Sequence, residues 1–73
     1  MMNTSLLKSI MVKHGDTQQT LATAMGLSLS RVNAKFCERG GAAFTQTEMA
    51  FIIERYHLSP EEAMAIFFAT KVS

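Results

Sequence analysis

Apolar residues recur every three or four positions through most of the chain, and this spacing is typical of amphipathic helices. The clearest example is Met49, Ile52, Ile53 and Tyr56, which follow the pattern i, i+3, i+4, i+7. We expect five helices and no strand, over residues 4–14, 17–25 and 29–39 and in two further segments that begin after Thr45 and after Ser59. Since 73 residues correspond to one domain, the pattern predicts a single all-α domain over residues 1–73.

Residues that favour helix ends stand at the expected boundaries. Asp16 or Thr17 suits the cap of the second helix. Thr45 begins TQTE and Ser59 begins SPEE, and both spacings are typical of a capping box, in which two side chains satisfy free backbone amides of the first turn. Glycines at positions 15, 26, 40 and 41 follow the first three helices, where a left-handed backbone ends a helix readily. Residues 70–73 are expected to fray.

Some apolar residues fall outside one stripe per helix. Phe51 lies off the face described above, and the adjacent Phe67 and Phe68 do not both fit into one small core. In the last helix, Ala63, Ile66 and Phe67 are placed to face inward. Two explanations stay open: a fully buried helix, or a surface for self-association or for a partner protein. The candidate residues for such a surface are Phe51, Phe67 and Phe68.

Residues 17–36 have the apolar spacing of a helix-turn-helix. Leu21, Ala22 and Met25 form the apolar side of a first helix, and Gly26 suits its end. Ser28 suits the cap of a second helix, whose apolar side is formed by Val32 and Phe36. Two short helices joined by a tight turn that contains glycine are a common device for placing a helix in the DNA major groove. This stretch therefore predicts DNA binding.

The second helix of this motif would present four side chains to base edges. With Val32 and Phe36 turned inward, Ser30 and Ala34 point away from the core, and Arg31 and Asn33 flank them. Arg31 suits guanine, and Asn33 suits adenine. Ser30 suits either role of donor or acceptor, and Ala34 suits a thymine methyl group. Leu29 falls at the edge of the buried side. The candidate base-reading residues are Ser30, Arg31, Asn33 and Ala34.

Contacts to the DNA backbone would come from the sides of the motif. The free amides near Thr17 and Gln18 favour a phosphate group, and the side chains of Gln18 and Gln19 can assist. Lys35 and Arg39 would reach the sugar-phosphate chain from the second helix. These five residues are the candidate backbone contacts.

The charge of the chain suits DNA only in its first half. The net charge is +1. Residues 1–39 hold five Lys and Arg against two Asp and Glu, which gives +3, and residues 40–73 hold two against four, which gives −2. Few phosphates would be neutralised, and Glu38 stands among the candidate contacts, so a monomer would bind weakly at physiological salt. Either a homodimer on paired half-sites or a target other than DNA would resolve this difficulty.

The sequence holds no set of residues typical of an enzyme or a metal site. No nucleophile has an adjacent base, no glycine-rich loop suits a phosphate, and Glu61 and Glu62 are explained as charges at a helix start. Cys37 is the single cysteine and has no ligand partner nearby, so we expect no metal and no cofactor. No apolar run approaches the length of a membrane span or a signal peptide, and we therefore expect no membrane partner and a cytoplasmic location.

Several segments in order resemble short regulators encoded by phages and prophages of Gram-positive bacteria, which have a helix-turn-helix of the Cro and lambda-repressor type. The segments are LATAMGLS from Leu21, Lys35, FTQTEM from Phe44, LSPEE from Leu58, and Ile66-Phe67-Phe68. The resemblance covers about residues 6–68. It implies a five-helix lambda-repressor-like domain and a role in the switch between lysogenic and lytic transcription.

Such small regulators act in one of two ways. A Cro-like protein occupies operator DNA itself, whereas a modulator or antirepressor binds the phage repressor protein and alters its DNA binding. The resemblance thus implies operator DNA or the phage repressor protein as partner, inside the bacterial host cell. The neutral outward face of the reading helix, with Leu29, Ser30 and Ala34, keeps the second possibility open.

Overall fold

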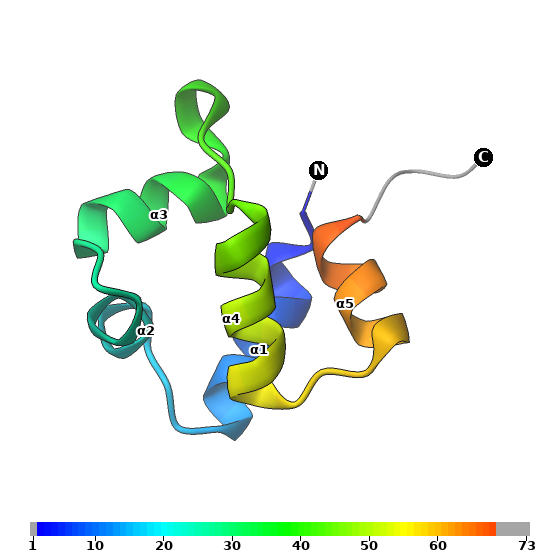
Figure 1. Ribbon diagram of the computed structural model, residues 1–73. Coiled ribbons are helices and arrows are strands. Elements are labelled where there is room, and N and C mark those ends of the chain that lie inside the picture. Colours follow the sequence, from blue (N-terminus) through cyan, green and yellow to red (C-terminus); the bar gives the residue numbers. More distant parts are fainter. Residues whose placement is uncertain (1, 69–73) are drawn as a thin grey trace.

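The computed structural model describes residues 2–68, and within them the chain forms five α-helices, one short 3-10 helix and no strand (Figure 1). The elements in order are α1 (Thr4–Lys13), α2 (Gln18–Met25), α3 (Leu29–Cys37), the 3-10 helix η1 (Arg39–Gly41), α4 (Gln46–Tyr56) and α5 (Pro60–Phe67). The predicted all-α fold with five helices is confirmed for this part of the chain. The fraying expected at residues 70–73 lies outside the described residues.

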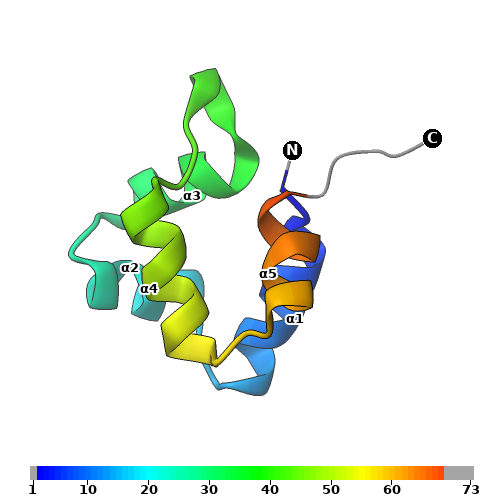
Figure 2. The ribbon, with the colours of Figure 1, turned by 45° about the vertical axis from the view of Figure 1, so that its right-hand side comes forward.

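In Figure 1, helix α4 lies in front of α1, with α2 and α3 on one side of it and α5 on the other. The rotated view keeps α1 and α5 side by side, and the Asn3 amide at the start of α1 donates to the Ile66 carbonyl of α5 at 2.7 Å (Figure 2). Each of the five α-helices contributes to one apolar core, which also takes in two residues between helices. The buried residues are Leu7, Ile10, Met11, Leu21, Ala22, Val32, Phe36, Phe44, Ile52, Tyr56, Leu58 and Ile66.

Each of the five α-helices begins at a side chain that accepts a hydrogen bond from an amide of the first turn. These caps are Asn3, Thr17, Ser28, Thr45 and Ser59. The two expected capping boxes, at the starts of α4 and α5, are both present. Of the two candidate caps for α2, Thr17 takes the role, and Thr20 closes its capping box. Local side-chain chemistry therefore sets where the helices begin.

The end of α3 differs from the expectation. The helix stops at Cys37, two residues before the expected end at residue 39, because Glu38 adopts a left-handed backbone with φ of 51°. Gly40 and Gly41 then have φ of 60° and 82°, and they shape the turn that leads back toward the core. This reversal brings Phe44 edge-on against Phe36, with ring centroids 5.7 Å apart. Helix α1 likewise ends one residue early, at Lys13.

The packing of α4 and α5 shows which of the surplus apolar side chains are buried and which are exposed. Phe51 on α4 is exposed, and Met64 and Phe68 at α5 are each more than half exposed. Neither helix is fully buried, so that explanation of the surplus apolar residues is wrong. Phe67 packs against the core instead, and its ring lies 6.4 Å from that of Phe44.

Candidate nucleic-acid interface

Helices α2 and α3 are joined by only three residues, 26–28. Gly26 ends α2 in the left-handed conformation, with φ of 72°, and the Leu27 amide donates to the Ala22 carbonyl at 2.9 Å. A Cβ atom on Gly26 would meet nothing within 4 Å, so glycine is needed here for its backbone and not for space. Leu27 packs against the core, and Ser28 then caps α3. The direction of α3 is therefore fixed immediately after α2 ends.

Helix α3 has one buried side and one outward side. Val32 and Phe36 anchor the buried side in the core. Of the four candidate base-reading residues, Ser30 and Arg31 are exposed, whereas Asn33 and Ala34 are half-buried. The Arg31 guanidinium has no ion-pair partner among residues 2–68. The outward side of α3 is thus available to a partner, although two of its four candidate residues are partly covered.

The start of α2 leaves two backbone amides unused. Thr17 and Thr20 satisfy each other in the capping box, with the Thr17 amide 2.8 Å from the Thr20 Oγ1. The amides of Gln18 and Gln19 donate to no group in the described part of the chain. The Gln19 side-chain amide donates a hydrogen bond to the Thr23 hydroxyl, whereas the Gln18 side-chain amide makes no hydrogen bond in the described part of the chain. This end of α2 accordingly keeps donors for an anionic group.

A shallow hollow lies where the first residue of α2 meets the first turns of α3. Its lining residues are Gln18, Leu29, Ser30 and Asn33. Leu29 is 42% exposed, which is high for a leucine side chain among polar neighbours. The apolar pattern of the sequence places Leu29 at the edge of the core and indicates no role for it in binding. The hollow brings it together with three of the predicted site residues.

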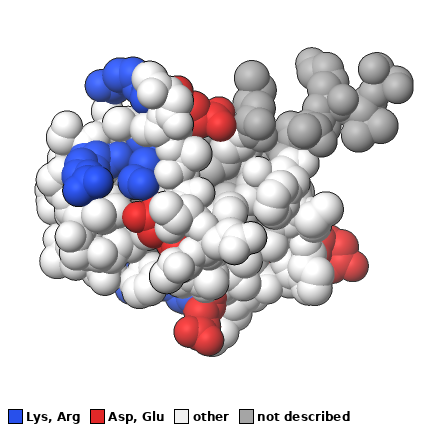
Figure 3. Space-filling view, turned by 45° about the horizontal axis from the view of Figure 1, so that its top comes forward, with Lys and Arg blue, Asp and Glu red and all other residues white. Residues whose placement is uncertain are grey.

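The basic residues near this surface are not equally available. In Figure 3 basic atoms gather over α3 and the loop that follows it, and acidic atoms lie directly beside them. Arg39, the first residue of the 3-10 helix η1 in that segment, is exposed. The Lys35 ammonium instead lies 3.0 Å from the Glu48 carboxylate and 3.0 Å from the Ala43 carbonyl oxygen, and its side chain is only 13% exposed. Lys35, a candidate phosphate contact, is therefore turned toward the start of α4.

Glu48 serves two structural roles at once. It completes the capping box of α4 by accepting from the Thr45 amide at 2.9 Å, and the same oxygen accepts from Lys35. Burial raises the pKa of Glu48, but the Thr45 amide and the Lys35 ammonium outweigh burial and lower the pKa below its ordinary value. Glu48 thus stays ionised at neutral pH and neutralises Lys35.

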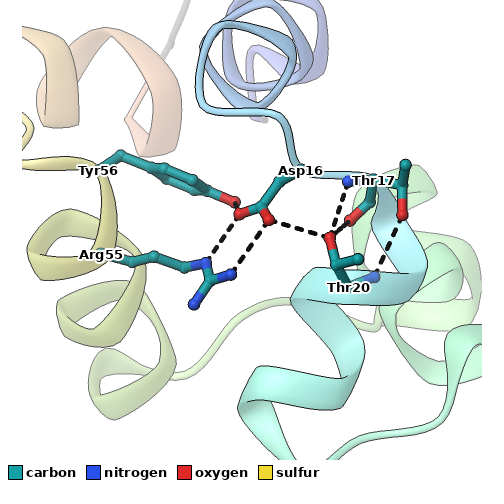
Figure 4. A network of polar contacts seen from close by, with 5 residues as sticks. All are labelled: Asp16, Thr17, Thr20, Arg55 and Tyr56. Atoms are coloured by element: carbon teal, nitrogen blue, oxygen red, sulfur yellow. Dashed lines mark hydrogen bonds and ion pairs between the residues drawn. The ribbon is translucent and has the colours of Figure 1, made fainter.

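A polar network that sequence analysis missed ties the start of α2 to the end of α4 (Figure 4). Asp16 accepts from Arg55 Nε at 2.8 Å and from a terminal nitrogen of the same guanidinium at 3.1 Å. It also accepts from the Tyr56 hydroxyl at 2.7 Å and from the Thr20 hydroxyl at 3.0 Å. The sequence indicates only a helix cap at Asp16, because its partners Arg55 and Tyr56 lie about 40 residues away and no local spacing connects them.

The network shifts the ionisation of its members. The Arg55 guanidinium beside Asp16 holds the pKa of that carboxyl well below its usual range, against an opposing effect of burial. Burial, followed by the hydrogen bond to Asp16, raises the pKa of Tyr56 to about 12. Asp16 is therefore a carboxylate with four hydrogen bonds, and it holds Thr20 in the first turn of α2.

The structure contains no arrangement typical of a metal site or a membrane span in the part it describes. Among residues 2–68, no three His, Cys, Asp or Glu side chains are grouped so that they could hold a metal ion. Cys37 is free and exposed. None of the described helices is both long and apolar enough to cross a membrane.

Comparisons with family models, curated proteins and solved structures find no match to this chain. The case for a function therefore rests on the residues and the geometry described above.

Proposed function

We propose that α2, residues 26–28 and α3 act as a helix-turn-helix, and that the protein is a Cro-like regulator that binds operator DNA. The observation that carries this proposal is the outward side of α3, which is exposed beside the unused amides at the start of α2 while Val32 and Phe36 anchor the helix from behind. In a phage or prophage, such a protein would act on the lysogenic-lytic switch in the host cytoplasm, as a binding protein and not as an enzyme.

In this proposal α3 enters the major groove. Arg31 would donate to guanine O6 and N7, and Asn33 would pair with adenine N6 and N7. The amides of Gln18 and Gln19 and the side chain of Arg39 would contact phosphates and fix the register. With Lys35 neutralised by Glu48, few phosphates are paired with a cation, so the affinity of one copy is low at physiological salt. We therefore propose that two copies bind paired half-sites.

Selection from a random duplex library, followed by fluorescence anisotropy on the enriched site at rising salt, tests this function. Arg31→Ala and Asn33→Ala should each weaken specific binding by about 1–3 kcal/mol. The charge-matched control is Lys13→Ala, which removes an exposed cation from the end of α1 and should leave sequence preference unchanged. If the folded protein enriches no sequence and binds no duplex at low salt, the proposal is wrong.

A second candidate function is modulation of the phage repressor by direct binding. One observation favours it: Lys35 on the proposed DNA-binding helix is neutralised within the molecule, while Phe51 on α4 and Phe68 at the end of α5 expose aromatic surface elsewhere. Co-purification with the repressor of the same phage tests it, and Phe51→Ser should weaken that complex but not DNA binding. Absence of any complex with the repressor would refute this candidate.

A further inference from the structure

The hollow between α2 and α3 combines one apolar side chain with groups that can donate and accept hydrogen bonds. Leu29 is the first residue of α3, and Gln18 is the first residue of α2. Gln18 and Asn33 carry amide groups, and Ser30 carries a hydroxyl. The Gln18 side-chain amide has no hydrogen-bond partner among the described residues. The Asn33 side-chain oxygen accepts only a weak hydrogen bond, from the Cys37 thiol at 3.9 Å. The polar groups of the hollow are thus largely available to a ligand.

An A·T base pair offers a matching combination in the major groove. Thymine presents a 5-methyl group beside its O4 acceptor, and adenine presents the N6 donor and the N7 acceptor. A G·C pair presents no methyl group there. An amide side chain pairs with adenine through both of its polar atoms, and an apolar side chain packs against the thymine methyl. The chemistry of the hollow therefore suits A·T and leaves Leu29 without a partner at G·C.

We infer that this hollow receives the major-groove edge of an A·T base pair, with Leu29 against the thymine methyl group and the Gln18 and Asn33 amides as candidates to bond the adjoining base edges. The inference rests on the proposed function and names Leu29 as a specificity-determining residue of that site. The helical spacing of the sequence instead favours Ala34 as the contact of the thymine methyl group. Leu29 is the better candidate because its side chain is longer and 42% exposed, whereas Ala34 is half-buried.

The position of Leu29 supports this role. The N-terminal residues of a helix that enters the major groove are those that contact base edges. Leu29 occupies that position, next to Ser30 and the exposed Arg31. Met64, another exposed apolar residue, lies on α5, on the far side of α4 from α3 (Figure 1). An exposed apolar side chain at the start of α3 is therefore placed where a base edge would meet it.

Replacement of thymine by deoxyuridine removes only the methyl group and tests the inference directly. Each thymine of the enriched duplex is replaced in turn, and binding is measured by anisotropy. At one position per half-site, the change should weaken binding by the protein about fourfold, the value for one buried methyl group. Leu29→Ala should bind the thymine and deoxyuridine duplexes equally. Met64→Ala, the matched truncation of an exposed apolar residue, should keep the fourfold difference.

The outcomes separate this inference from the function on which it rests. Circular dichroism first confirms that Leu29→Ala folds, as expected for alanine at an exposed helical position. If the protein binds a specific duplex but no deoxyuridine replacement weakens binding, the inference is wrong and the proposed function stands. A fourfold effect that persists in Leu29→Ala also overturns the inference, because the methyl group would then contact another residue. If no duplex is bound specifically, the function fails and the inference fails with it.

Discussion

The substitution Asp16→Asn removes the central charge of the α2–α4 network and almost nothing else. Asparagine has the same shape and still accepts one or two of the hydrogen bonds from Tyr56 and Thr20. The two-point contact with Arg55 loses its charge, although the Arg55 side chain is 32% exposed and stays partly hydrated. A hydrogen bond to a charged group contributes about 1.5–3 kcal/mol. We expect the free energy of unfolding to fall by about 2 kcal/mol.

That loss is large for a chain of this length, because the whole domain has a stability of roughly 4–11 kcal/mol. Urea unfolding followed by far-ultraviolet circular dichroism measures it, and the melting temperature should fall by roughly 8–16 °C. The matched control is Glu54→Gln, which neutralises an exposed carboxylate on α4 and should change stability by less than about 0.5 kcal/mol.

The pH dependence checks the cause. The folded pKa of Asp16 is depressed, so its contribution to stability is present above the unfolded-state pKa of about 3.9 and is lost as pH falls toward the folded pKa. The difference between the protein and Asp16→Asn should be constant from about pH 5 to pH 8 and should shrink below about pH 4. Equal stability of the two proteins at neutral pH would refute the reasoning, and so would a difference that does not change in acid.

Three further predictions follow from single residues. Tyr56 is the only tyrosine and there is no tryptophan, so the ultraviolet absorbance of the protein should report the ionisation of Tyr56 near pH 12. The substitution Asp16→Asn should lower the pKa of Tyr56. Ionisation at the ordinary pH of about 10 would contradict the network. Gly26→Ala should cost about 1–2 kcal/mol in urea unfolding, because alanine resists the left-handed backbone, and an unchanged midpoint would show that the turn relaxes. If the proposed DNA binding holds, Glu48→Gln should keep the α4 cap and release Lys35 for DNA. The slope of log affinity against log salt concentration should then steepen by about one unit. An unchanged slope would mean that Lys35 does not reach phosphate.

The starts of the helices were predictable because they depend on residues three positions apart. Thr45 with Glu48 and Ser59 with Glu62 form their capping boxes within one helical turn, so no other part of the molecule is needed to place them. The buried sides of the helices were predictable for a similar reason. A repeat such as Ile52 and Tyr56 marks one side of a helix wherever that helix packs.

The end of α3 was less predictable because it depends on a distant contact. The glycines at positions 40 and 41 indicated a helix end near residue 39, but the helix stops at Cys37. Glu38 adopts the left-handed backbone although it is not glycine, and the chain then returns to place Phe44 against Phe36. Packing in the core therefore outweighs the local preference of the backbone.

The sequence by itself determined the five helices and the capping boxes of α4 and α5, because these depend on neighbours along the chain. Only the tertiary structure decided which charges are paired, since Asp16, just before α2, meets Arg55 of α4, and Lys35 of α3 meets Glu48 of α4. It also decided the composition of the candidate site, by turning Lys35 away and by placing Leu29 beside Gln18. The members of each pair come from separate segments of the chain, and their distances depend on how the helices pack, which no local spacing specifies.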